Sequence, residues 1–214
     1  MSKSSKRHFW EWFKRNNKEY LELNKKSKKE AAYWLNELNA HLRAYFKFFG
    51  YSLALQEKQV STLTITVHGK TAHFKKVEAL VATAPDIPGW RITALEDPKP
   101  IDFMLEKQIE EVDVHPDELY FSILGEEPGG TAIMVYHPLC TKENEHLFLQ
   151  LADAAIFNLL GERNYGLEIS WMDVTNLSYA EPDDVHRLED LPECIGARKG
   201  SMVVDGGGKL LEMG

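Results

Sequence analysis

The fold of this chain is decided by residues 120–136, whose sequence is YFSILGEEPGGTAIMVY. Two short runs suited to strands flank a polar, glycine-containing turn, a pattern typical of a β-hairpin. Residues 142–160 then show helical periodicity before Gly161, and residues 166–172 form another strand-like run. The order hairpin, helix, strand is therefore predicted for residues 119–176.

The same order is predicted earlier in the chain. Two short runs with a period of two residues, the second at 63–67, precede a helix predicted over residues 72–84. Prolines stop that helix, and residues 90–95 follow as a strand. We therefore interpret residues 51–95 and 119–176 as two ββαβ pseudo-repeats.

Residues 1–50 are predicted to form a pair of helices ahead of the first hairpin. Ser27 and Glu30 have the spacing of a capping box, which places the start of the second helix at this point. Apolar side chains at steps of three and four residues give this helix one stripe that must be covered: Leu35, Leu38, Leu42, Tyr45 and Phe49. The predicted fold class is α+β, with the helical pair packed on a largely antiparallel sheet.

One core is enough for a chain of 214 residues with 43% hydrophobic content. We expect residues 1–214 to form a single domain in which residues 177–214 dock as a tail. Residues 101–114 fit a helical and a strand period equally well. The sequence therefore does not decide between helix and strand for these residues.

The sequence predicts a cytoplasmic protein. It has no run of eighteen uncharged apolar residues, so no membrane partner is expected. The basic opening at 3–7 leads into a stretch that already carries charges, unlike a secretory signal. Two isolated cysteines, Cys140 and Cys194, are typical of buried thiols in a reducing compartment.

Charge divides the chain unevenly. The formal net charge is −8, which argues against nucleic acid as a partner because phosphate backbones bind basic surfaces. Residues 1–50 carry twelve Lys/Arg against five Asp/Glu, a net +7, and residues 51–214 carry thirteen against twenty-eight, a net −15. A basic head thus precedes an acidic body.

Several blocks of sequence resemble an uncharacterised bacterial protein family to which no activity is assigned. The blocks are FWEWF at 9–13, LTIT at 63–66, AP at 84–85 leading into GWRITAL at 89–95, and LLGE at 159–162. They are spread over residues 8–175 and consist of apolar and turn residues. The resemblance implies fold and bacterial lineage, and it assigns no site residue.

The candidate metal ligands are His137, Cys140 and His146, with Glu143 and Glu145 close by in the sequence. Imidazole and thiolate groups at short spacing can bind zinc. Acidic residues are also expected at a helix start, because they complement the helix dipole. Since the cluster lacks the four close Cys or His ligands of a structural zinc site, we predict no metal centre.

The candidate catalytic residues are His115, Asp113 and His68. His115 lies between Asp113 and Asp117, and a neighbouring carboxylate can orient an imidazole as a general base. Such clusters also occur in solvated turns, and no Ser or Cys has the sequence context of a nucleophile elbow. No cofactor motif is found, so no cofactor is predicted.

We expect a non-catalytic regulatory or protein-interaction module whose acidic body attracts a protein partner with a basic surface. Glu126 and Glu127, in the predicted hairpin turn, are expected to contribute to this attraction. Two alternatives remain open. One is an enzyme whose site is assembled from scattered His and Asp/Glu residues, such as His68, His115 and His137. The other is an inhibitor or immunity-type protein that masks a basic effector.

Overall fold

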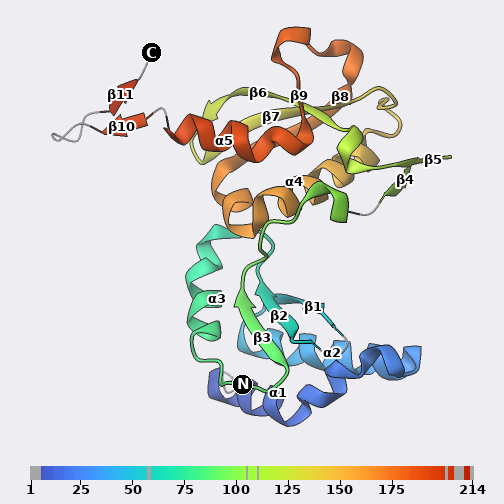
Figure 1. Cartoon of the computed structure of the whole chain (residues 1–214), viewed down its shortest axis with the longest axis vertical. Helices are drawn as coiled ribbons and strands as arrows, with labels where there is room; N and C mark the ends of the chain where they lie inside the picture. Colours follow the sequence, from blue (N-terminus) through green and yellow to red (C-terminus); the bar gives the residue numbers. More distant parts are fainter. Residues whose placement is uncertain are drawn as a thin grey trace. The chain divides into compact units, whose positions relative to one another are not determined.

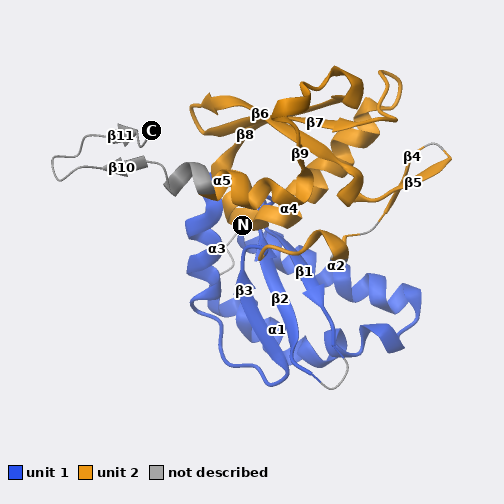
Figure 2. Cartoon of the chain, turned by 45° about the horizontal axis from the view of Figure 1, so that its top comes forward, with its two compact units in different colours: residues 1–96 blue, residues 97–214 orange. Residues whose placement is uncertain are grey.

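The chain divides into two compact units, an N-terminal unit of residues 1–96 and a C-terminal unit of residues 97–214 (Figure 2). The structure is a computed structural model, and it describes residues 6–56, 59–104, 106–109, 111–200, 202–204 and 210–212. Each unit has its own cluster of buried apolar side chains. The units are therefore described one at a time.

The N-terminal unit combines a helix pair with a three-stranded sheet (Figure 1). Its main elements are α1 (Lys6–Leu21), α2 (Lys28–Tyr45), β1 (Gly50–Ala54), β2 (Ser61–Thr66), α3 (Phe74–Val81) and β3 (Trp90–Ala94). Strand β2 is central, pairing antiparallel with β1 and parallel with β3. The parallel pair is joined through α3, because parallel neighbours need a crossover connection.

The predicted capping box starts α2. The Ser27 hydroxyl accepts a hydrogen bond from the Glu30 amide at 3.3 Å, and the Glu30 carboxylate accepts one from the Ser27 amide at 3.1 Å. The helix ends at Tyr45 and not at Gly50, which pairs with Thr66 as the first residue of β1. Because Gly50 is paired within the sheet, α2 ends before the glycine in the sequence.

The helix pair contributes aromatic and leucine side chains to the core of this unit. The core includes Phe9 and Phe13 from α1, Leu42 from α2, and Leu63 and Ile65 from β2, all of them fully buried. The sequence-based expectation that the helix stripe is covered is confirmed for Leu38, Leu42 and Phe49, which are buried, but not for Leu35, which is exposed. Burying one such side chain stabilises the fold by about 1.5–3 kcal/mol relative to leaving it exposed.

The C-terminal unit is built on a four-stranded sheet with the order β8-β7-β6-β9. Its main elements are β4 (Lys107–Ile109), β5 (Val112–Val114), β6 (Tyr120–Glu127), β7 (Gly130–His137), α4 (Glu145–Glu168), β8 (Ile169–Asn176), β9 (His186–Arg187), α5 (Leu191–Gly200), β10 (Met202–Val204) and β11 (Leu210–Glu212). Strand β6 is antiparallel to β7 and to β9, and β7 is parallel to β8. The open question over residues 101–114 is answered by the small antiparallel hairpin of β4 and β5.

Helix α4 differs from the sequence-based prediction at its end. Gly161 interrupts it with φ 69° and ψ 160°, yet helical structure continues to Glu168. The next strand starts at Ile169, three residues after the predicted start. A left-handed glycine can thus bend a helix as well as end it when the following residues keep helical packing.

The prediction of one sheet is wrong, because the described strands form separate small sheets, two of them mixed. Helices α3 and α4 return the chain beside the strand it has just left, so β2–β3 and β7–β8 are parallel pairs. The α+β class with an N-terminal helix pair is confirmed. In the part of the chain that the structure describes, no helix is both long and apolar enough to cross a bilayer.

Candidate functional site

A cavity of about 810 Å³ lies at the carboxyl ends of the parallel strands β7 and β8. Loops at this edge of a parallel pair converge, and ligands of α/β proteins commonly bind there. The lining comes from the loop before α4, the start of α4, and the end of β8 with the residues after it. The lining residues are Cys140, Thr141, Lys142, Glu143, Glu145, Thr175, Asn176, Ser178 and Tyr179.

Two asparagine side chains fix the wall of this cavity. The Asn144 carboxamide accepts from the Thr141 amide at 2.8 Å and donates to the Leu139 carbonyl at 3.1 Å. From the end of β8, the Asn176 Nδ2 group donates to the Cys140 carbonyl at 2.9 Å. The loop between β7 and α4 is therefore tied both to itself and to the neighbouring strand.

The cavity lining includes two carboxylates, Glu143 and Glu145, and one ammonium group, that of Lys142. Burial raises the pKa of the Cys140 thiol, and the charges of Glu145 and Asp173 raise it further. Because negative charges oppose formation of the thiolate, Cys140 stays a protonated thiol at neutral pH. The Cys140 thiol is therefore not an activated nucleophile.

His137 is a buried packing residue at the end of β7, with 3% of its surface exposed. Burial lowers its pKa, and the charge of Glu118 opposes this only in part. Its Nδ1 atom accepts from the Leu139 amide at 3.2 Å, and its ring stacks on Phe148 with 4.7 Å between centroids. The neutral imidazole therefore orders the loop that forms the cavity wall.

The structure does not bring the three candidate metal ligands together. His137 and Cys140 are buried, whereas His146 is exposed on α4. Among the described residues, no three His, Cys, Asp or Glu side chains come together in a group that could hold a metal ion. The sequence spacing of these residues thus reflects a strand end followed by a helix start.

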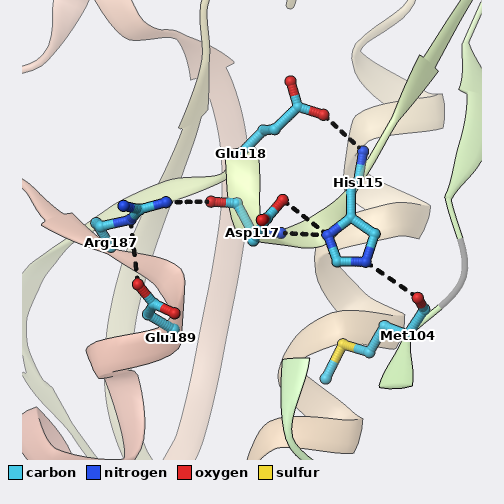
Figure 3. A network of polar contacts seen from close by, with 6 residues as sticks. All are labelled: Met104, His115, Asp117, Glu118, Arg187 and Glu189. Carbon is cyan, nitrogen blue, oxygen red and sulfur yellow. Dashed lines mark hydrogen bonds and ion pairs between the residues drawn. The ribbon is translucent and has the colours of Figure 1, made fainter. Parts of the chain in front are cut away.

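His115 is held by protein atoms on both sides of its ring (Figure 3). Its Nδ1 atom lies 2.7 Å from the Asp117 carboxylate, and its Nε2 atom lies 3.1 Å from the Met104 carbonyl. Its backbone amide donates to the Glu118 carboxylate at 2.8 Å, which completes a capping box around the short 3₁₀ turn Pro116–Glu118. Arg187 extends the network by donating to the Asp117 carbonyl at 3.3 Å.

These contacts explain the ionisation of His115. Burial lowers its pKa, but the hydrogen bonds to Asp117 and Met104 outweigh that effect, so the pKa is raised overall. Both ring nitrogens are engaged in hydrogen bonds that order a turn, which makes His115 a structural residue of the C-terminal unit. Asp113 lies on β5 with an exposed side chain and is not part of this network, and His68 belongs to the N-terminal unit.

The residues that shape the cavity were missed by sequence reasoning. Asn144 had a usable signal, because an Asn just before a helical pattern and three residues after Thr141 suits a local turn. Asn176 is the last residue of β8 and Tyr179 follows that strand, but the pairing of β8 with β7 is not visible in the sequence. Only the fold brings the ends of these strands together.

Comparisons with known proteins found no match to this chain. No family model matches the chain, and neither a curated protein nor a solved structure does. The resemblance to an uncharacterised bacterial family stays a prediction. The functional argument therefore depends on the geometry and charge of the two units alone.

Proposed function

We propose that the chain is a non-catalytic protein-interaction module, and that its C-terminal unit binds a protein partner with a basic surface at the cavity beside β7 and β8. The observation that carries this proposal is the lining of the cavity, which includes two carboxylates, Glu143 and Glu145, and one ammonium group, that of Lys142. A lysine or arginine side chain entering the cavity would meet these carboxylates together with neutral hydrogen-bond acceptors.

The charge of each unit supports the proposal. The N-terminal unit carries seventeen Lys/Arg against nine Asp/Glu, a net +8, and the C-terminal unit carries eight against twenty-four, a net −16. The net charge changes sign at the boundary between the two units, near residue 96, and not at residue 50. The negative charge is therefore a property of one compact unit, and it attracts basic surfaces over about one Debye length.

Exposed side chains around the cavity have the composition of an interaction surface. Tyr179 is 76% exposed and Leu139 is 47% exposed. Acidic side chains follow at once in the chain and are also exposed: Glu181, Asp183 and Asp184. An aromatic ring beside carboxylates suits an arginine, because the guanidinium group can stack on the ring while it pairs with the acids.

The same surface fits the inhibitor or immunity-type alternative, in which the basic partner is an effector. The enzyme alternative has less support, because His115 has both ring nitrogens engaged and the Cys140 thiol is held protonated. We also propose that the two ββαβ segments are related as pseudo-repeats. Their shared order of one antiparallel and one parallel strand pair supports that relation.

The proposal is tested with a labelled eight-residue peptide of alternating Arg and Gly, measured by fluorescence anisotropy against the full chain. In the test variant, Glu143 and Glu145 are both replaced by Gln. Two exposed ion pairs at about 0.2–1 kcal/mol each predict affinity weaker by roughly 2- to 30-fold. A peptide of alternating Glu and Gly is not expected to bind this unit.

The matched control replaces Glu126 and Glu127 with Gln, which removes the same charge from the opposite end of β7. The pair lies at the hairpin turn, about 23 Å along the strand from the cavity. If the cavity is the binding site, Glu126 and Glu127 contribute to the expected attraction only through the overall charge, so the control should lose much less affinity than the test variant. Equal losses would show that only the overall charge attracts the peptide, and the cavity would then not be the binding site.

A further inference from the structure

A cluster of lysines and aromatic rings lies at one edge of the N-terminal sheet. Its members come from the segment between α2 and β1, from the loop between β2 and α3, and from α3 itself. They are Phe46, Lys47, Phe48, Lys70, His73 and Lys76, called here the lysine–aromatic cluster. Gly50 pairs with Thr66, so the first of these segments lies beside the carboxyl end of β2.

Each of the three lysine ammonium groups lies over an aromatic ring of the cluster. Lys47 Nζ lies 4.7 Å and Lys70 Nζ lies 5.0 Å from the centroid of the Phe48 ring, and Lys76 Nζ lies 3.8 Å from that of Phe46. The two phenyl centroids are 5.4 Å apart. The three distances from an ammonium group to a ring centroid are within the range of a cation–π interaction. Such an interaction lowers the free-energy cost of keeping these flexible lysine side chains in place.

Among the described residues, no carboxylate forms an ion pair with these ammonium groups, those of Lys47, Lys70 and Lys76. The first turn of α3 contains no acidic residue. Lys75, next to Lys76, is exposed as well. Ordinary surface lysines are dispersed among carboxylates, whereas these three concentrate positive charge on two adjacent rings.

The backbone beside the cluster is strained in a defined way. His68 has φ 53°, a left-handed conformation that is uncommon for residues other than glycine, and Gly69 follows with φ 75°. The His68 ring lies so close to Gly50 that a Cβ atom there would be 2.5 Å from His68 Nε2. The sharp turn directs the chain from β2 toward Lys70, and strain of this kind is often kept at binding sites.

We propose that the lysine–aromatic cluster binds a small molecule that carries phosphate. A phosphate monoester has close to two negative charges and three acceptor oxygens, which suit three ammonium groups approaching from different segments. The cluster lies at the carboxyl edge of the parallel pair β2–β3, where the loops of such pairs commonly receive ligands. This inference concerns the N-terminal unit and does not depend on the function proposed for the C-terminal unit.

Single-stranded nucleic acid fits this cluster less well. Such ligands stack their bases on free aromatic faces. Here His73 stacks on Phe48 at 5.0 Å with 11° between ring planes, and lysine ammonium groups lie over the same ring. The faces of the Phe48 ring are occupied by His73 and by lysine ammonium groups, so bases cannot stack on them. The cluster therefore suits a compact anion better than a strand of bases.

The test uses the full chain and three probes: inorganic pyrophosphate, citrate, and an eight-nucleotide thymidine oligomer. Isothermal titration calorimetry gives each affinity for the unmodified chain and for a variant with Lys47→Gln and Lys70→Gln. We expect pyrophosphate to bind more tightly than citrate and the variant to lose about tenfold or more in pyrophosphate affinity, because each lysine supplies a charge-assisted hydrogen bond.

The control variant carries Lys28→Gln and Lys29→Gln, the same charge change at the start of α2. These positions are about 25 Å along the helix from Phe46, and we expect a loss below about twofold. A third variant, Phe48→Leu, keeps an apolar side chain but removes the ring, and should weaken pyrophosphate binding by an intermediate factor. Circular dichroism checks that each variant is folded.

Four results would overturn the proposal. They are no binding of pyrophosphate, equal affinity for citrate and pyrophosphate, equal losses in the two lysine variants, and an oligomer that binds more tightly than pyrophosphate with the same dependence on Lys47 and Lys70. The second would indicate recognition of charge alone. The fourth would indicate a nucleic-acid surface.

Discussion

Replacing Asn176 with Asp should loosen the wall of the cavity in the C-terminal unit. The Asn176 Nδ2 group donates to the carbonyl oxygens of Pro138 at 2.7 Å and Cys140 at 2.9 Å. Its Oδ1 atom accepts from the Ser178 amide at 3.0 Å. Aspartate keeps that acceptor but has no donor, so the substitution removes the two bonds that tie the loop after β7 to the end of β8.

The expected loss is about 1–3 kcal/mol of unfolding free energy. Each of the two hydrogen bonds contributes about 0.5–1.5 kcal/mol net, and an aspartate would also direct a negative charge at two carbonyl oxygens. Glu145 and Asp173 already create a negative field at the neighbouring Cys140. The new carboxylate would therefore be repelled as well as left without its partners.

Two measurements check this expectation. Urea denaturation gives the loss of stability, and hydrogen–deuterium exchange should show faster exchange of amides in residues 139–144. The matched control is Asn158→Ala, because the half-buried Asn158 side chain donates, among the described residues, only to the Ala154 carbonyl of its own helix, at 2.7 Å. That control should stay within about 0.5 kcal/mol. Unchanged stability and exchange in Asn176→Asp would show that these bonds do not hold the loop.

Two further predictions concern the same unit. Because the folded pKa of His115 is raised, its contribution to stability is fully present below pH 6.5 and is lost as pH rises through the folded pKa. The urea midpoint of the unmodified chain should therefore exceed that of His115→Gln by less at pH 8.5 than at pH 6. A difference between the two midpoints that grows with pH would contradict this. Gly130→Ala should destabilise by about 2 kcal/mol or more, since φ is 137° and a Cβ atom would lie 2.5 Å from the Glu168 carbonyl oxygen. Gly129→Ala, with φ 108° and open space around it, is the control for backbone strain alone, and equal losses in the two variants by urea denaturation would exclude the clash.

Local sequence signals predicted the parts of the fold that depend on neighbouring residues. The capping box of Ser27 and Glu30 forms as its spacing indicates. The hairpin from residue 120 to 136 forms with its turn where glycines allow positive φ angles. Both depend on contacts between residues only a few positions apart, so the sequence contains all that is needed to predict them.

The candidate site could be predicted only in part, because the chemistry of a side chain depends on what surrounds it. His115 and its flanking acids suggested a general base, yet the Met104 carbonyl, eleven residues away, occupies its second nitrogen. His137 and Cys140 suggested a metal site, yet both are buried in packing. The lysine–aromatic cluster joins residues 46–48 to residues 70–76, a pairing with no local signal.

The sequence by itself determined the α+β class, the helix pair, the order of strands and helices within residues 51–95 and 119–176, and the opposite charges of the two ends of the chain. These follow from periodicity, capping, turn residues and composition, which act over short distances or add along the chain. Only the tertiary structure decided that the strands form separate mixed sheets, that the charge changes sign at the boundary near residue 96, and that the ends of β7 and β8 enclose a cavity. Strand pairing and burial decide these features, because they bring together residues whose separation in sequence carries no information about their contact.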